Sequence, residues 1–181
     1  SYQSGPIIPG PTYNTTLQNL ADILTRCRDV RNCGLLPDFS SSLEKYLYST
    51  FLAYYEKDDQ VYQVEKKEDN RGYLFELIKT KNAGQIFVSR TFPGITRGNH
   101  YHDTKVEKFC VLEGKALIKL RNMVSGEINE IYVEGTDGTI VDIPPGWTHN
   151  ITNVGTTDLI TLFWANENFN SEKPDTYFCE V

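Results

Sequence analysis

Three histidines and one glutamate are the residues of this sequence best suited to metal or proton chemistry. His100 and His102 lie two positions apart, Glu107 follows five positions after His102, and His149 lies in a second segment. Neutral imidazole and carboxylate oxygen together bind zinc, iron, manganese or nickel. An imidazole is also the usual proton carrier of a metal-free site. These residues therefore predict a metal centre or an acid–base site, with a purely structural cluster as the third interpretation.

The local pattern decides whether the four side chains can converge. In a strand, residues two apart point to the same face, so His100 and His102 project together and Tyr101 points away. Glu107 is an odd number of positions from His102, so the intervening DTKV segment must turn the chain if the carboxylate is to join the imidazoles. His149 follows a Pro-Pro-Gly turn, which would hold it at the start of a new strand.

The elements that would position these residues are short strands. From about residue 60 the apolar period is two, and glycine or proline turns interrupt it at roughly ten-residue intervals. We expect strands at residues 73–79, 85–92, 107–113, 115–121, 127–134, 139–143 and 158–164. No helix of crossover length separates them, which argues against a parallel βαβ sheet and favours an all-β antiparallel sandwich or barrel.

Two amphipathic helices are expected before the strands. Residues 14–27 carry apolar side chains at spacings of three and four, with Asn14 or Thr15 as the N-cap, and residues 40–55 repeat the pattern behind a serine cap. Residues 1–12 are rich in glycine, proline and serine and have no apolar period, which predicts a loop or a remnant of an expression vector. We therefore divide the chain into a helical segment, residues 1–56, and a β domain, residues 57–181.

Composition argues against several classes of function. A net charge of -6 argues against a nucleic-acid partner, since such proteins usually carry a basic face. No run approaches the roughly 18 apolar residues of a membrane span, and the N-terminus lacks the pattern of a secretion signal. The four cysteines form no C-x-x-C pair and are too sparse for a disulfide framework. We expect a cytoplasmic protein with reduced thiols.

Both histidine segments resemble the two sequence motifs of the cupin superfamily. The first reads G-x5-H-x-H-x4-E-x6-G over residues 94–114, the second reads G-x5-P-x-G-x2-H-x3-N over residues 138–153, and 23 residues separate them. The resemblance implies a double-stranded β-helix, the jelly-roll barrel. It also implies a divalent metal, zinc first and iron, manganese or nickel as alternatives, bound by His100, His102, Glu107 and His149. It does not name the reaction, because cupins host many.

A narrower resemblance covers residues 57–181. The segments EDNRGYLFELIKT, PGITRGNHYHDTKVEKF, VDIPPGWTHNITNVG and the ending FWANENFNSEKPDTYFCEV are similar to the C-terminal cupin domain of bifunctional capsular-polysaccharide enzymes of the CapF type. That family implies C3 epimerisation of a UDP-4-keto-6-deoxy-N-acetylhexosamine, on the way to UDP-N-acetyl-L-fucosamine. In the family, an N-terminal short-chain reductase domain then reduces C4 with NADPH. The helices within residues 1–56 resemble the tail of that reductase, so we expect a C-terminal fragment of a two-domain enzyme. This fragment has no nucleotide fingerprint and should bind no NADPH by that route.

The epimerisation needs a base on one face of the sugar and an acid on the other. If the histidines bind metal, the candidates are a metal-bound hydroxide, Lys108, Tyr132 and Tyr101.

A second enzymatic interpretation is metal-free. The segment RGNHYH also resembles the R-G-x-H segment of dTDP-4-keto-6-deoxyglucose 3,5-epimerases and of 3,4-ketoisomerases. In that interpretation His100 is the base, Arg97 binds substrate, and Arg71 and Glu76 belong to a nucleotide pocket that a dimer could share. Glu107 and His149 favour the metal, since a histidine base does not require them. A non-enzymatic cupin that binds sugar or metal is a third class.

Further residues are candidates for contact with a UDP-sugar. Arg71, Arg90 and Arg97 suit a diphosphate because guanidinium is planar and always charged, although each could equally be a solvated or structural arginine. Trp147 could stack on uracil or a sugar ring, or cap the barrel as a wedge. A homodimer is expected, since the strand-like residues 61–67 would otherwise leave an unpaired sheet edge.

Overall fold

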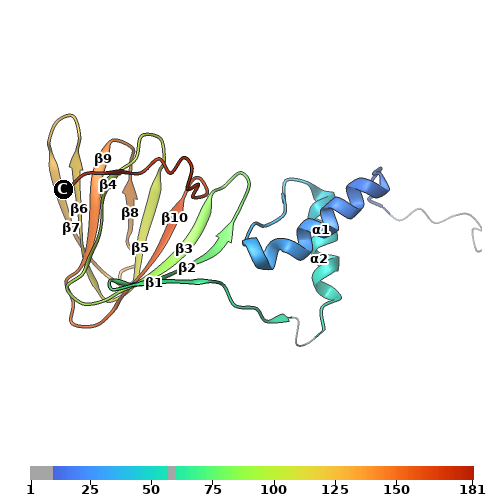
Figure 1. Cartoon of the computed structure of the whole chain (residues 1–181), viewed down its shortest axis with the longest axis horizontal. Coiled ribbons are helices and arrows are strands. Elements are labelled where there is room, and N and C mark those ends of the chain that lie inside the picture. The colour runs from blue at the N-terminus through green and yellow to red at the C-terminus, as the bar shows by residue number, and fades with distance from the viewer. Residues whose placement is uncertain (1–9, 57–59) are drawn as a thin grey trace, which may run out of the picture.

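The computed structural model describes residues 10–56 and 60–181, which form two helices followed by a β barrel (Figure 1). Most of the loop or vector remnant expected at residues 1–12 lies outside the described residues. The expected division at residue 56 borders on residues 57–59, which also lie outside them, so the two-part division stays a proposal.

Two helices precede the barrel, as the apolar spacing predicts. The first, α1, spans Leu17–Cys33, and the second, α2, spans Ser42–Ala53. The side chain of Thr16 caps α1, two residues after the expected Asn14 and one after the expected Thr15, and Ser41 caps α2. Helix α1 continues beyond residue 27 and stops where Gly34 takes the left-handed conformation with φ 68°. Neither α1 nor α2 is long and apolar enough to cross a membrane.

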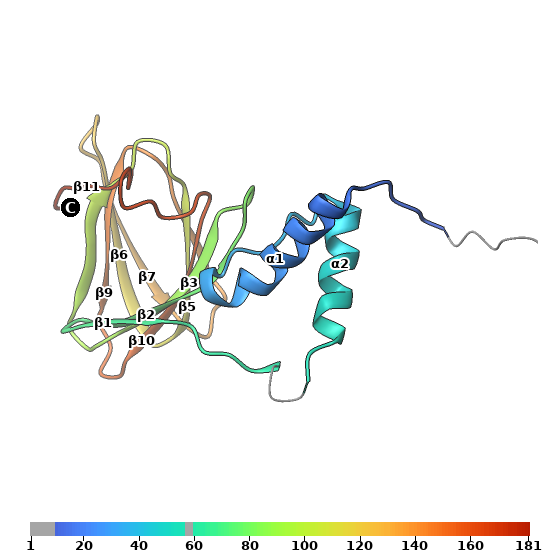
Figure 2. The same ribbon diagram turned by 45° about the vertical axis from the view of Figure 1, so that its right-hand side comes forward.

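The helical segment stands beside the barrel and is joined to it by a short backbone contact (Figure 2). Ile23, Cys27 and Val30 of α1 are buried, whereas α2 has no buried residue. After α1, the chain pairs with the end of a barrel strand, where the N–H of Leu36 donates to the carbonyl of Lys79 at 2.8 Å.

Eleven strands in the described part of the chain form two antiparallel sheets. They are β1 (Lys66–Asp69), β2 (Gly72–Lys79), β3 (Gln85–Thr91), β4 (Thr96–Tyr101), β5 (Glu107–Glu113), β6 (Lys115–Asn122), β7 (Ile128–Glu134), β8 (Ile140–Ile143), β9 (Trp147–Asn153), β10 (Leu159–Ala165) and β11 (Tyr177–Phe178). The sheet orders are β1-β2-β3-β10-β5-β8 and β11-β4-β9-β6-β7. Neighbours in these orders are often distant in sequence, as in a jelly roll, so the predicted all-β cupin barrel is confirmed.

The core lies between the two sheets and fixes which strand residues point inward. Phe109 and Val111 of β5 and Ile118 and Leu120 of β6 are buried, alternating with more exposed residues. The rings of Phe163 and Phe109 meet edge to face with centroids 4.6 Å apart. Residues nearer the strand ends also face inward, but they are not part of this packed core. They can therefore form a binding site at the end of the barrel.

The C-terminal segment after β10 runs along one end of the barrel (Figures 1 and 2). It ends in β11, where Tyr177 and Phe178 pair with Tyr101 and His100 of β4. This segment therefore borders the strand end that carries the first pair of histidines.

Candidate metal centre

His100, His102, Glu107 and His149 converge at one end of the barrel. One ligand atom from each of the four lies within 4.8 Å of all the others. His102 and His149 are 2% and 1% exposed, and Glu107 is 8% exposed. The ring centroid of His100 is 5.0 Å from that of His102 and 4.6 Å from that of His149. The structure thus brings together the four side chains whose types suit a divalent metal.

Three strands deliver these side chains. His100 lies near the end of β4, directly across from His149 of β9, and a register shift at Asn99, with φ 59°, precedes that pairing. His102 follows β4, and Glu107 begins β5. The chain turns between them, as the odd spacing requires. The carbonyl of His102 accepts from the N–H of Gly146 at 2.8 Å, which ties the first histidine segment to the Pro-Pro-Gly turn of the second.

Hydrogen bonds at the outer ring nitrogens show which nitrogen of His102 and of His149 carries a proton. Nδ1 of His102 lies 2.5 Å from the carbonyl oxygen of Asp175, and Nδ1 of His149 lies 3.2 Å from that of Trp147. A carbonyl oxygen can only accept, so each Nδ1 carries a proton, and in the neutral form of either ring the lone pair is on Nε2. A ring nitrogen bonded to a backbone carbonyl in this way is characteristic of metal-ligating histidines.

The inner ring nitrogens face a carboxylate. Nε2 of His102 and Nε2 of His149 lie 3.2 Å and 3.4 Å from Oε2 of Glu107, and both nitrogens are buried without a hydrogen-bond partner. Two lone pairs and a carboxylate in mutual contact would repel one another, and buried unpaired polar atoms are costly. A divalent cation among them removes both penalties, so the residues present fit a metal.

Burial and charge set these groups in forms that bind metal. Burial, with the neighbouring His149 and His102, lowers the pKa of His100 to about 4, so its imidazole is neutral at pH 7. Burial raises the pKa of Glu107, but hydrogen bonds and positive charge from His102 and His149, which these rings supply when Nε2 is protonated, outweigh it and bring that pKa down to about 2. Neutral imidazole and ionised carboxylate are the ligand forms.

A cavity of about 330 Å³ opens beside the cluster. Apolar and polar side chains share its wall, and the described residues that line it are Lys67, Leu74, Glu76, Gln85, Phe87, His100, His102, Lys105, Glu107, Ala165, Phe169 and Thr176. Glu76, expected near the ligand, is among them and pairs with Lys67 and Lys79, both at 2.9 Å. Lys105 and Thr176 were not expected from the sequence. Lys105 lies between two motif residues, and only that position could have drawn attention to it.

Lys108 and Tyr132 are not among the described residues that line this cavity, so a role for either in proton transfer stays a prediction. Lys108 follows the inward-facing Glu107 in β5, so alternation turns it to the outer face, where it pairs with Asp142. Tyr132 is 72% exposed on the outer face of β7. Tyr101 also points away, stacked on Tyr177 with ring centroids 5.3 Å apart.

The three arginines lie outside the cavity lining described above. Arg71 pairs with Asp69, and Arg90 pairs with Asp158. Arg97 is half-buried and donates from Nε to the hydroxyl of a threonine at 3.0 Å. Their contact with a diphosphate therefore stays a prediction.

Trp147 packs against the core cluster, as the wedge interpretation expects. Its carbonyl, rather than its ring, serves the candidate site through His149.

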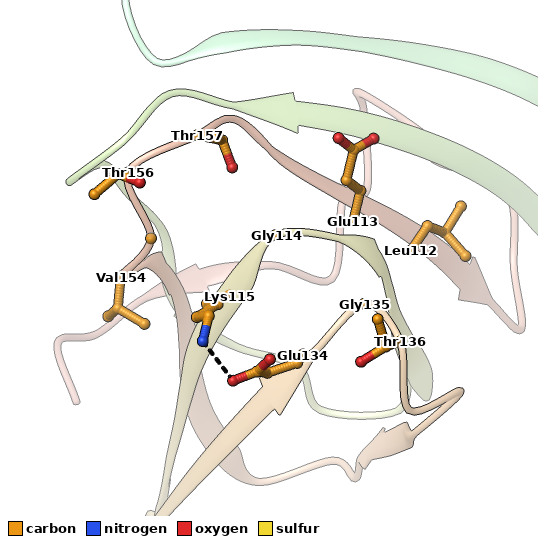
Figure 3. A pocket seen from close by; sticks show the side chains of 11 residues that line it. Leu112, Glu113, Gly114, Lys115, Glu134, Gly135, Thr136, Val154, Thr156 and Thr157 are labelled. Carbon is orange, nitrogen blue, oxygen red and sulfur yellow. Dashed lines mark hydrogen bonds and ion pairs between the residues drawn. The ribbon is translucent and has the colours of Figure 1, made fainter.

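A second cavity, of about 450 Å³, lies at the opposite end of the strands (Figure 3). Loops after β5, β7 and β9 form it, and an ion pair between Lys115 and Glu134 crosses it at 2.7 Å. Its lining among the described residues contains no histidine or cysteine. The end of the barrel with the four converging ligands is therefore the better candidate for chemistry.

Known proteins share this architecture. A Pseudomonas aeruginosa protein named UDP-2-acetamido-2,6-beta-L-arabino-hexul-4-ose reductase is 43% identical over 171 residues, which are 94% of this chain and 46% of that protein. The crystal structure of the capsular polysaccharide assembling protein CapF from Staphylococcus aureus matches with a TM-score of 0.89 at 43% identity, covering 99% of this chain and 50% of that chain. The chain thus spans about half the length of these relatives.

A structure of oxalate oxidase, matched with a TM-score of 0.52 at 19% identity over 64% of this chain and 59% of that one, shares the fold alone. Residues 67–177, more than half of the chain, match the family described as the polysaccharide biosynthesis C-terminal domain. This match runs from β1 to β11 and includes both histidine segments. The chain therefore belongs to the family of polysaccharide biosynthesis C-terminal domains, built on a cupin barrel.

Proposed function

We propose that this domain is a nucleotide-sugar epimerase of capsular or O-antigen polysaccharide precursor synthesis. It inverts C3 of a UDP-4-keto-6-deoxy-N-acetylhexosamine in a pathway of the UDP-N-acetyl-L-fucosamine type, using a divalent metal held by His100, His102, Glu107 and His149. The name of the Pseudomonas relative describes a UDP-linked 4-ketohexose as the compound reduced. A domain that sets the configuration next to that ketone would fit beside such a reductase.

The observation that carries the proposal is the pair of buried, unpartnered Nε2 atoms that face Glu107. A metal-free histidine base needs one imidazole and a free approach to the substrate. That mechanism does not require the Nε2 atoms of His102 and His149 to be buried against the carboxylate of Glu107. Four converging ligands beside a cavity favour metal-assisted chemistry on a ligand that enters from that cavity.

The chemistry requires an acidic C–H bond. The hydrogen at C3 lies next to the C4 ketone and becomes acidic when the enolate oxygen is stabilised, which a bound metal supplies as a Lewis acid. The chain itself shapes the pocket for that step. Phe87 and Phe169 line the cavity and exclude water from the sugar ring, and the Glu76 carboxylate, held by two lysines, can accept hydrogen bonds from sugar hydroxyls.

Finer points belong to the same proposal. Zinc suits three imidazoles and a carboxylate, with iron, manganese or nickel as alternatives. An NADPH-dependent reductase domain would precede these residues in a longer chain, and the helical segment would be its tail. We also propose that the protein is cytoplasmic. We propose a homodimer because β1 forms the outer edge of its sheet and all four of its residues are exposed. Light scattering that shows a monomer would contradict the dimer.

The test combines metal analysis with hydrogen exchange. The protein is assayed by mass spectrometry for bound metal, then incubated in deuterium oxide with the UDP-4-keto-sugar and followed by NMR. We expect near-stoichiometric metal and deuterium at C3. Glu107→Gln should lose both, whereas Glu113→Gln, an exposed change at the far end of the same strand, should lose neither.

Two outcomes would favour the other classes. Deuterium incorporation by rigorously metal-free protein would favour His100 as the base of a metal-free epimerase or ketoisomerase. Metal or sugar binding without exchange, in this domain and in a longer chain that includes the reductase, would favour a non-catalytic binding module.

A further inference from the structure

Lys105 is an unusual residue of this barrel. It is 5% exposed, and it is the one buried lysine or arginine in residues 10–56 and 60–181. Removal of an ammonium group from water costs several kcal/mol, so lysine is almost never buried without a close carboxylate. The nearest ion-pair partner of Lys105 is Glu167, whose Oε1 lies 3.9 Å away, beyond hydrogen-bond range.

Two neutral oxygens hold the ammonium instead. Nζ of Lys105 donates to the carbonyl oxygen of Pro174 at 2.6 Å and lies 3.5 Å from the hydroxyl oxygen of Thr176. An ammonium has three N–H donors. These contacts use at most two of them, so one N–H remains for a ligand.

Lys105 lies where this remaining N–H can reach a ligand bound beside the four candidate metal ligands. Lys105 lines the same cavity as His100, His102 and Glu107. Its backbone N–H donates to Oδ2 of Asp175 at 2.8 Å, which holds the residue in the turn between two metal-ligand candidates. The buried cation and the proposed metal would therefore border one small ligand.

We propose that Lys105 is a catalytic residue of the epimerisation, donating a hydrogen bond to the C4 oxygen of the keto-sugar as negative charge develops there. The inference rests on the proposed function. When a base takes the C3 proton, the C3–H electron pair forms the C3=C4 double bond and the carbonyl pair moves to oxygen. Reprotonation at C3 from the opposite face reverses these changes. The ammonium stabilises the enolate oxygen without losing its own proton.

A purely structural role for Lys105 would require a hydrogen-bond donor but not a positive charge. To tie the C-terminal segment to the turn, Lys105 needs only a donor to Pro174, and a neutral amide would do this without burying a charge. The charge itself is explained by a ligand oxygen that becomes negative. The rate of the chemical step should therefore depend on the charge, whereas metal content and folding should not.

The variants Lys105→Gln, Lys105→Met and Lys105→Arg separate these roles, with Lys119→Met, on the outer face of β6, as the control. Bound metal, thermal unfolding, and kcat and KM for C3 deuterium exchange are measured for each. We expect both neutral variants to bind metal fully. Lys105→Met should lose about 100- to 1000-fold in kcat, as removal of one oxyanion donor does elsewhere, and Lys105→Gln, which keeps N–H donors but carries no charge, should lose about 10-fold or more, each with a smaller change in KM. Lys105→Arg should recover part of the rate, and Lys119→Met should match the wild type.

An exchange rate for Lys105→Gln within about threefold of the wild type, which is well below the loss expected from an oxyanion donor, would overturn the inference. So would a rate loss that merely follows lost metal or lost folding in the neutral variants. If Lys105→Met proves unstable, Lys105→Gln decides, because its amide keeps a donor for Pro174. Absence of exchange in the metal-loaded wild type would instead overturn the proposed function. Equal exchange rates in the wild type and Lys105→Gln would overturn the role of Lys105 and leave the proposed epimerase function intact.

Discussion

Asp175 offers the sharpest test of how the C-terminal segment supports the metal centre. Its carboxylate accepts from the backbone N–H groups of Asp103, Thr104 and Lys105 at 2.9, 3.0 and 2.8 Å, and from the hydroxyl of Thr104 at 3.0 Å. Its own carbonyl accepts from Nδ1 of His102. One residue therefore holds the turn that the odd spacing requires and also orients His102, a candidate metal ligand.

Asp175→Ala removes four hydrogen bonds to an ionised group. A hydrogen bond to a charged group contributes about 1.5–3 kcal/mol net, and access of water to this half-buried carboxylate, together with relaxation of the turn, reduces the expected loss to about 2–4 kcal/mol in the free energy of unfolding. Loss of a residue that orients a ligand costs roughly 10- to 100-fold in metal affinity. Asp175→Asn should lose less, because asparagine tolerates the φ of 42° found here and keeps one acceptor oxygen.

The assay is zinc affinity by competition with a chromophoric chelator, with urea unfolding of the metal-free protein in parallel. Glu172→Ala, an exposed change in the same segment, is the control. We expect affinity to fall in the order wild type, Asp175→Asn, Asp175→Ala. If Asp175→Ala lost stability but kept the wild-type affinity for zinc, the idea that this residue orients His102 would be wrong.

Three further predictions concern the cluster and the barrel. Glu107→Gln should weaken zinc binding by more than the roughly 100-fold that loss of a supporting residue costs, measured by the same competition. In the metal-free protein, His100 should contribute a loss of up to about 3 kcal/mol of stability between pH 6.5 and pH 4, because the unfolded imidazole gains a proton over this range and the folded one, with its pKa near 4, largely does not. Urea unfolding of His100→Ala should therefore show a smaller pH dependence than that of the wild type. Gly84→Ala should cost about 3 kcal/mol or more, since its Cβ would lie 1.8 Å from the carbonyl oxygen of Ala165, whereas Gly94→Ala, at a similar φ with open space, should cost about 1 kcal/mol in thermal unfolding.

The strands were predictable because their pattern is local. The expected strand at residues 107–113 coincides with β5, and the other six expected strands match within one residue at each end. Alternation of buried and exposed side chains, broken by glycine, carries that information. By contrast, β1 and β11 have no such pattern. All residues of both are exposed, and they exist because a neighbouring strand offers free backbone groups.

The edge strand shows this limit in detail. Residues 61–67 looked strand-like, but the observed β1 begins at Lys66 and ends at Asp69. Its register with β2, in which Asp69 lies across from Gly72, is set by the tight turn between them. The turn, rather than the apolar pattern before it, decides where this strand lies.

The convergence of His100, His102, Glu107 and His149 was predictable from the motif, but the residues around them that could carry or donate protons were not. Simple alternation already argues against Lys108, since it follows an inward-facing Glu107, and the same reasoning turns Tyr132 outward beside the buried Val133. Lys105 lies in an irregular turn, where no period applies. Its burial depends on Pro174 and Thr176, about 70 residues away in sequence, so only the folded chain reveals it.

The C-terminal segment supports the whole ligand set rather than one residue of it. Asp175 bonds to His102, Phe178 pairs in register with His100, and the carbonyl of Cys179 accepts from the hydroxyl of Thr148, the neighbour of His149, at 2.5 Å. The motif residues would supply the ligand atoms, whereas the C-terminal segment holds their side chains in orientation. A change in the tail can therefore alter metal affinity without contact with the metal, and a sequence that keeps both motifs but has a different tail need not keep the same metal or the same reaction.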